Sequence, residues 1–210
     1  MRPLILVGGG GHCKSVIEAC ESSGFQIKGI LDLPENIGRN ILSYPIIGTD
    51  DDISNYMSEC DFVVTVGFIK DPTLRLRIYD KIRLAGGCFA TIIASTAYVS
   101  GYAKIGAGTV ILHQAMVNAG ATIGEGCIIN TFANIEHDAI IEDYCHISTG
   151  VMVNGHCRVG REVFLGSQSV MVNGVSIVSG CIIAAGSTIC KNILQRGIYS
   201  GNPAVLKIKL

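Results

Sequence analysis

The chain has 210 residues, with 16 Lys or Arg and 17 Asp or Glu, which leaves a formal net charge of −1. A chain so close to neutral has no general electrostatic attraction to nucleic acid or to an anionic membrane, although a local basic cluster can still bind a phosphorylated ligand. The length is sufficient for two small domains, each with its own hydrophobic core.

The N-terminus and the cysteines indicate the compartment. Leu4–Val7 is too short for the apolar core of a signal peptide and leads directly into Gly8. No apolar run approaches the roughly 18 residues that a membrane-spanning helix needs. The nine cysteines include no CxxC pair, which argues against a zinc cluster or a redox motif. We therefore expect a reduced, cytoplasmic protein without membrane insertion.

Residues 1–90 alternate between strand and helix patterns, which is typical of a Rossmann-like α/β domain with a parallel sheet. The expected elements are, in order, strand Leu4–Val7, a helix that follows Gly8–His12, strand Ile27–Leu31, an acid-rich helix start near Asp50–Met57, strand Phe62–Val66 and helix Thr73–Leu84.

A glycine-rich turn joins the first expected strand to the first helix. Backbone N–H groups at such a helix N-terminus bind anions, and residues at the carboxyl ends of the next strands lie at the same edge of the sheet. The candidate substrate-binding residues of this domain are Gly10, Gly11, His12, Asp32 and Gly67. The dinucleotide fingerprint is not met, because Cys13 stands where it needs Gly or Ala. The alternative is that the glycines only form a tight turn.

From Ile93 to Ile189 every sixth residue is a large aliphatic, 17 times in succession. A second series, four residues after each anchor, is mostly Ala, Cys, Ser, Thr or Val. This period fits neither a helix nor a single alternating strand, and it predicts short strands wound into a solenoid. The pattern resembles the left-handed parallel β-helix, in which three hexapeptides make one coil. We assign residues 91–195 to this domain and residues 196–210 to a C-terminal extension.

Three segments resemble one group of enzymes, the sialic acid O-acetyltransferase and bacillosamine-type amino-sugar acetyltransferase family of hexapeptide-repeat acyltransferases. Residues 130–138, NTFANIEHD, are similar to the family's catalytic segment, and residues 145–148, CHIS, to its second histidine segment. Residues 201–204, GNPA, look like the turn near the coenzyme A. The sequence departs from the family at two positions, with Asp138 where bacillosamine-type enzymes carry Glu and Leu33 where some relatives have a second acid.

The resemblance implies that acetyl-CoA is the co-substrate and that His137 and Asp138 are catalytic. A histidine can take the proton of the attacking amine or hydroxyl, and an acid can fix its tautomer. Stacking places Gly155 one coil above His137, where its N–H can face the oxyanion. The expected coenzyme A-binding residues are His146, Gly155, Ser167 and Ala185.

The other histidines have plainer interpretations. His113 and His156 fall at turn positions and are expected to be surface groups, with His156 stacked one coil above Asp138. A zinc hydratase of the carbonic anhydrase type also uses this solenoid, but the spacing of His137, His146 and His156 does not resemble its pattern. We therefore expect no metal cofactor.

Together these observations predict an acetyl-CoA-dependent acetyltransferase that acts on a nucleotide-linked amino sugar in bacterial surface glycan synthesis. Two alternatives remain open, namely O-acetylation of a free sugar such as sialic acid and a non-catalytic sugar-nucleotide-binding solenoid.

The spacing of His137 and His146 bears on the oligomeric state. The two residues are half a coil apart, so their side chains leave opposite parts of one triangular coil. This spacing predicts a homotrimer with shared sites. Leu112, Val172 and Val178 are expected on the exposed exterior that such packing covers.

Overall fold

The computed structural model describes residues 2–210. The first domain contains a five-stranded sheet in the order β3-β4-β2-β1-β5, mostly parallel, with β3 and β4 forming an antiparallel hairpin. Its elements are β1 Leu4–Val7, α1 Gly11–Ser22, β2 Ile27–Leu31, a 3₁₀ turn Pro34–Asn36, β3 Asn40–Ile41, β4 Tyr44–Gly48, a 3₁₀ turn Asp50–Asp52, α2 Ile53–Tyr56, β5 Asp61–Val64 and α3 Thr73–Leu84. The expected strands and helices are present. The β3–β4 hairpin was not predicted.

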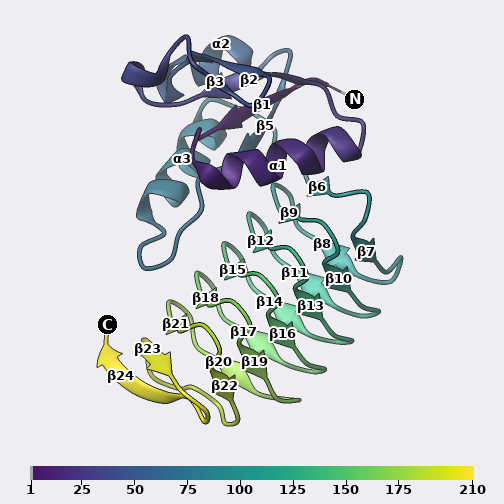
Figure 1. Cartoon of the computed structure of the whole chain (residues 1–210), viewed down its shortest axis with the longest axis vertical. Coiled ribbons are helices and arrows are strands. Elements are labelled where there is room, and N and C mark those ends of the chain that lie inside the picture. Colours follow the sequence, from purple (N-terminus) through teal and green to yellow (C-terminus); the bar gives the residue numbers. More distant parts are fainter. Residues whose placement is uncertain (1) are drawn as a thin grey trace.

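The rest of the chain forms a solenoid with three faces, visible below the first domain in Figure 1. The first face contains β6 Ile92–Ile93, β9 Val110–Ile111, β12 Ile128–Ile129, β15 His146–Ile147, β18 Phe164–Leu165 and β21 Ile182–Ile183. The second contains β7 Tyr98–Val99, β10 Met116–Val117, β13 Asn134–Ile135, β16 Met152–Val153, β19 Val170–Met171 and β22 Thr188–Ile189. The third contains β8 Lys104–Ile105, β11 Thr122–Ile123, β14 Ile140–Ile141, β17 Arg158–Val159 and β20 Ser176–Ile177. Each strand pairs in parallel with the equivalent strand of the next coil, as Met116 does with Asn134. This architecture is the left-handed β-helix.

The aliphatic series fills the interior of the coils. Ile111, Ile129, Ile147 and Leu165 are all 0% exposed in one continuous core. The small residues of the second series are also buried from Thr109 onward, and several of them have a further role. The Sγ atoms of Cys127 and Cys145 donate hydrogen bonds of 3.1 Å to carbonyl oxygens 15 residues further on. Thr109 Oγ1 makes the same bond to the Gly124 carbonyl at 2.8 Å.

These cysteines are therefore hydrogen-bond donors as well as the compact hydrophobic residues that the repeat requires. Burial raises the pKa of the Cys145 thiol well above its ordinary value, which keeps the thiol protonated. All nine cysteines are free.

The first domain lies over the first coils, at the end of the solenoid opposite the C-terminus (Figure 1). Helix α1 packs against the first face, and Leu112 is buried in that contact with 1% exposure. The expectation that Leu112 is an exposed exterior residue was therefore wrong. The first domain covers it.

Arg75 on α3 joins the two domains, and its side chain is 1% exposed. Its guanidinium donates to the carbonyl oxygens of Val64 and Val66 at 2.9 and 2.5 Å, and to that of Gly126 on the solenoid at 3.0 Å. Tyr79 Oη, one turn further along the helix, donates to the Gly108 carbonyl at 2.9 Å. The helix is thereby hydrogen-bonded to two successive coils.

After β22 the chain returns to the first face. β23 Gly197–Ser200 pairs with β21, and β24 Val205–Lys209 runs antiparallel to β23.

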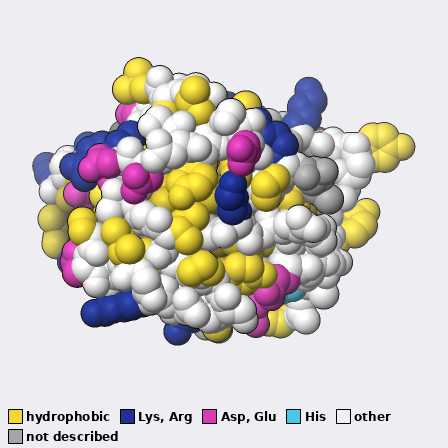
Figure 2. All heavy atoms as spheres, turned by 90° about the horizontal axis from the view of Figure 1, so that it is seen from above, with side chains coloured by type: hydrophobic (Ala, Val, Ile, Leu, Met, Phe, Trp, Pro, Cys, Tyr) yellow, Lys and Arg dark blue, Asp and Glu magenta, His cyan; other side chains and the backbone are white. Residues whose placement is uncertain are grey.

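No helix within residues 2–210 is both long and apolar enough to cross a bilayer. Figure 2, which looks onto the first domain, shows Lys and Arg interspersed with Asp and Glu among hydrophobic side chains.

We expect Arg75→Met to lower the free energy of unfolding by about 3 kcal/mol, because it leaves three carbonyl oxygens, two of them in buried hydrogen bonds, without their donor. Arg77→Met, an exposed position on the same helix, is the matched control and should change it by under about 0.5 kcal/mol. Urea denaturation followed by circular dichroism measures both. Equal midpoints for the two variants would contradict the role of Arg75.

Candidate active site

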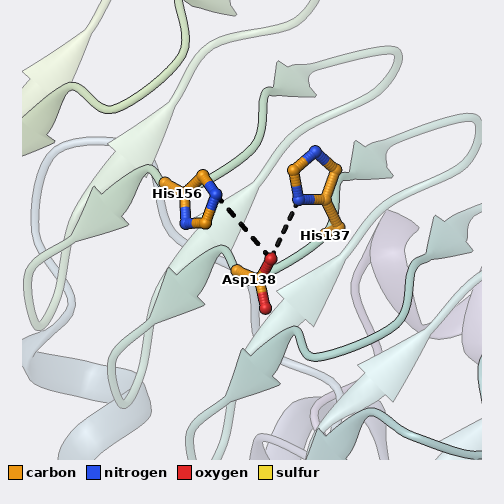
Figure 3. A group of neighbouring side chains, drawn as sticks. All are labelled: His137, Asp138 and His156. Carbon is orange, nitrogen blue, oxygen red and sulfur yellow. Dashed lines mark hydrogen bonds and ion pairs between the residues drawn. The ribbon is translucent and has the colours of Figure 1, made fainter.

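His137 and Asp138 lie at the corner between the second and third faces, directly after β13. His137 Nδ1 is 2.9 Å from Asp138 Oδ2, and both side chains are half exposed (Figure 3). Because a carboxylate only accepts, Nδ1 carries the proton and donates it to Asp138. The lone pair of the neutral imidazole is then on Nε2. The sequence placed this pair correctly outside the inward-facing slots.

The backbone at this corner is left-handed, and the same conformation occurs in four successive coils. Gly120, Asp138, His156 and Gly174, which occupy this position in four successive coils, have φ of 76°, 58°, 59° and 73°. A Cβ on Gly120 would lie 2.4 Å from Asp138 Oδ1, so a side chain there would require the carboxylate to move from its present position. Asp is also among the residues that tolerate this conformation best.

Gly155 lies against the imidazole of His137, as the stacking of coils predicted. A Cβ at Gly155 would be 2.7 Å from both Cε1 and Nε2 of His137. Its backbone N–H donates no hydrogen bond within residues 2–210. A free amide donor therefore lies beside the ring of the candidate base.

Sequence reasoning missed the polar network on the other side of His137. Glu136 accepts hydrogen bonds from Asn134 Nδ2 at 3.1 Å and from Asn118 Nδ2 at 2.9 Å. The hydrogen bond from Asn134 is the largest of the effects that lower the pKa of Glu136, so this carboxyl is ionised at neutral pH. The signal was available, since Asn118 and Glu136 are one coil apart in the repeat and therefore occupy the same corner column.

His146 occupies the first face, away from His137, and its side chain faces the first domain. Its Nδ1 is 2.7 Å from the Phe68 carbonyl oxygen, and its Nε2 is 3.4 Å from Asn130 Nδ2. A carbonyl only accepts, so Nδ1 carries the proton. Burial lowers the pKa of His146 to about 4 and that of its neighbour His12 to about 3. Both rings are neutral at pH 7.

The expected coenzyme A-binding residues are divided between different parts of the coil. Gly155 lies beside His137, and His146 is buried on the first face with 9% exposure. Ser167 is at the corner between the first and second faces, where its Oγ is 2.9 Å from Ser148 Oγ, and Ala185 follows it one coil later in the same column. One chain does not bring the four residues together.

The first domain has a cavity of about 330 Å³ at the carboxyl ends of its strands, lined by Gly8, Asp32, Thr49 and Arg77 among others. Asp32 therefore lies where the sequence placed it, with Oδ2 accepting from Asn36 Nδ2 at 2.9 Å.

The other expected ligand-binding residues lie outside that cavity. Gly10 and Gly11 are exposed at the start of α1, and His12 is turned toward His146, with ring centroids 6.3 Å apart. Gly67 lines a second cavity of about 630 Å³, together with Lys70, Asp71 and His146. Residues at the carboxyl edge of the sheet thus line two separate cavities.

The remaining histidines are surface groups, as expected. His113 Nδ1 is 2.8 Å from Thr96 Oγ1. His156 Nε2 is 3.8 Å from Asp138 Oδ2, one coil above it. His146 lies on a different face from His137 and His156, so these three histidines do not converge as zinc ligands.

Two family models match the chain. Residues 3–82 match the PglD N-terminal domain, and residues 120–155 match the bacterial transferase hexapeptide repeat. The chain also resembles solved structures along nearly its whole length. It is 28% identical to perosamine N-acetyltransferase from Caulobacter crescentus, solved as a mutant with CoA and GDP-perosamine, at a TM-score of 0.91 and a coverage of 98% of this chain and 96% of that one.

The acetyltransferase domain of PglB from Neisseria gonorrhoeae is 30% identical, with a TM-score of 0.90 and a coverage of 99% of this chain and 100% of that one. The chain belongs to this family of hexapeptide-repeat amino-sugar acetyltransferases. A curated relative, the uncharacterized protein L142 of Acanthamoeba polyphaga mimivirus, is 34% identical over 106 residues, which is 50% of this chain and 20% of that protein. As a member of the acetyltransferase family, the chain is an acyltransferase.

The buried histidines predict a pH dependence of stability. The folded pKa of His146, about 4, is below its ordinary value of 6.5, so the unfolded chain takes up the proton first and acidification favours unfolding. We expect the free energy of unfolding to fall from about pH 6.5 to about pH 4, by up to about 1.4 kcal/mol per pH unit for His146.

His146→Gln keeps a side-chain N–H donor and should make this fall shallower, whereas His113→Gln, at a partly exposed corner position, should not. Urea denaturation at several pH values measures the slope. Parallel curves for wild type and His146→Gln would contradict the assignment.

Proposed function

We propose that the chain transfers the acetyl group of acetyl-CoA to the amine of a nucleotide-linked amino sugar, in the cytoplasm, for bacterial surface glycan synthesis. The observation that carries the proposal is the 2.9 Å pair of His137 and Asp138 at an exposed corner of the coil. It occurs in a chain whose fold matches that of an enzyme solved with CoA and GDP-perosamine.

His137 is the general base in this proposal. Asp138 accepts the Nδ1 proton, so Nε2 presents its lone pair to the amine. The amine nitrogen attacks the thioester carbonyl carbon and transfers its proton to Nε2. The tetrahedral intermediate collapses, the C–S bond breaks, and the coenzyme A thiolate takes the proton from the imidazolium. Asp138 stabilises the imidazolium between the two steps.

Gly155 supplies the oxyanion donor. Its N–H lies beside the base and has no acceptor within residues 2–210, so it is free to bind the oxygen that becomes negative in the intermediate. A side chain at this position would also overlap His137, with Cβ 2.7 Å from Nε2. The overlap favours glycine, whereas the N–H would be supplied by any residue other than proline.

Asp32 is the acceptor for a hydroxyl of the nucleotide sugar, because it lines the cavity at the carboxyl ends of the strands, where nucleotides bind in such sheets. Gly10, Gly11, His12 and Gly67 belong to the same turn-and-edge region and are proposed to shape it. Ser167, Ala185 and His146 are proposed to contact coenzyme A.

We propose that the protein is a homotrimer with active sites between subunits. Arg75 and Tyr79 bind the first domain to the corner between the third and first faces, and α1 packs against the first face. His137 lies at the corner between the second and third faces, which is opposite the first face in a triangular coil. This placement supports the proposal that a nucleotide sugar bound in the first domain reaches the base of a neighbouring chain rather than His137 of its own chain.

The second face offers a surface for such packing. Tyr98, Met116 and Met152 stand at equivalent positions of stacked strands and are 57%, 42% and 36% exposed. The polar Asn134 stands between Met116 and Met152 in this column, and exposed apolar side chains of this kind are covered when solenoids pack side by side. Val172 and Val178, also expected at the exterior, are partly buried against the core.

Release of free thiol from acetyl-CoA tests the reaction. Wild-type chain is incubated with UDP-, GDP- and CMP-linked sugars carrying amines or hydroxyls, and with free sialic acid. Turnover with a nucleotide amino sugar alone supports the proposal. Turnover only with free sugars would establish the O-acetyltransferase alternative, and no turnover together with tight sugar-nucleotide binding would indicate the non-catalytic solenoid.

Replacing the base tests the assignment of His137. His137→Ala should lower kcat by about 10²–10⁴, the range for loss of a general base. Its folding should be retained, because the side chain is half exposed and outside the core. His113→Ala, at a corner position on another edge, is the control and should keep wild-type kcat. Wild-type turnover by folded His137→Ala would refute the assignment.

Mixing two inactive variants tests the shared site. His137→Ala lacks the base, and Asp32→Ala lacks the hydroxyl acceptor in the first domain. If one chain supplies each part, mixed trimers contain some sites with both parts intact, and activity should return to a fraction of wild type after subunit exchange. The control is each variant exchanged with itself. A mixture that stays inactive although exchange is demonstrated would contradict the arrangement.

A further inference from the structure

The carboxylate of Asp138 lies between two imidazoles (Figure 3). His137 Nδ1 is 2.9 Å and His156 Nε2 3.8 Å from the same oxygen, Oδ2. One donor atom from each of the three residues lies within 4.8 Å of the others. The two rings are nearly perpendicular, at 87°, with centroids 5.2 Å apart. The general base therefore uses only part of this cluster, and His156 has no place in the proposed reaction.

We propose that His137, Asp138 and His156 form a binding site for a divalent transition metal ion, with Zn²⁺ as the best fit. Two imidazoles and one carboxylate are a ligand set of zinc and its neighbours, and not of Mg²⁺ or Ca²⁺, which prefer oxygen ligands. Metal–ligand bonds of about 2.0–2.1 Å in a tetrahedron put the ligand atoms about 3.3 Å apart.

The geometry needs only small side-chain rotations to meet this spacing. The separations from Asp138 Oδ2, 2.9 and 3.8 Å, lie on either side of the tetrahedral value. The side chains of His137, Asp138 and His156 are 52%, 51% and 67% exposed, which leaves each of them room to rotate on the solvent side. The left-handed backbone shared by Asp138 and His156 directs both side chains to the same side of the corner.

Metal binding and base catalysis exclude each other at this site. A neutral imidazole has one N–H and one lone pair. A metal at Nδ1 of His137 takes the lone pair there, and the proton moves to Nε2, the nitrogen that must accept the proton of the amine. The metal is thus an inhibitor and not a cofactor. This consequence rests on the proposed role of His137, whereas metal binding does not.

Calorimetric titration with zinc chloride tests the site directly. The experiment uses the Cys88→Ser/Cys190→Ser chain, because those two free thiols are exposed and would bind zinc themselves. We expect one zinc ion per chain. Adding His156→Gln should weaken binding by at least about tenfold, through loss of one ligand. His113→Gln, at a partly exposed position on another corner, should leave the affinity unchanged. No zinc binding, or equal affinity in the His156→Gln chain, would overturn the proposal.

Initial rates of acetyl transfer test the inhibition, measured before released coenzyme A accumulates and its thiolate takes the metal. Zinc should lower the rate of wild type, EDTA should restore it, and His156→Gln should need at least about tenfold more zinc relative to its own zinc-free rate. Tight zinc binding with an undiminished wild-type rate would refute the inhibitory consequence. A chain without acetyltransferase activity in the absence of zinc would refute the proposed function instead, and calorimetry alone would then decide the metal site.

Discussion

The fixed offset of one coil between hydrogen-bonded strands is the constraint on which the rest of this structure depends. Each coil pairs in parallel with the next, as Met116, Asn134 and Met152 do along the second face. Every corner position therefore has one neighbour in the coil before it and another in the coil after it. The candidate active site is assembled from such columns, with Gly155 over His137 and Gly120 below Asp138. A site of this kind needs no inserted loop, because the regular stacking itself brings distant residues together.

The second determinant is the buried contact of α3 with the solenoid. The Arg75 guanidinium donates hydrogen bonds to carbonyl oxygens of both domains, so its charge has polar partners on each side although the side chain is buried. Leaving those carbonyls unpaired would be costly, which fixes the first domain on the first face. The position of the cavity lined by Asp32 relative to His137 follows from this contact. The separation between the two is a consequence of how the domains join, and it is the physical reason for which we propose a site shared between chains.

The sequence predicted what depends on local pattern and could not predict what depends on contacts between the domains. The aliphatic period predicted the 17 short strands, and the expected helix at Thr73–Leu84 is present with the same bounds. The orientation of His146 depends on the Phe68 carbonyl, 78 residues away in the sequence. Leu112 was misplaced for the same reason, since α1 buries it. The periodicity of the solenoid does not predict where another domain will pack against it. The Asn118–Glu136 pair, in contrast, could have been predicted from the sequence, because the two residues are one coil apart, as His137 and Gly155 are.

The choice of aspartate at position 138 links the proposed catalytic pair to the stacking of the coils. The corner requires a left-handed backbone, with φ of 58°, which Asp tolerates better than longer side chains do. A short side chain also keeps the carboxylate close to the corner, within 2.9 Å of His137 and beneath His156 of the next coil. The carboxylate that we propose to orient the base is therefore within reach of a second imidazole. If the proposed roles hold, this acid keeps the base in its reactive tautomer only while no cation occupies the space among the three groups.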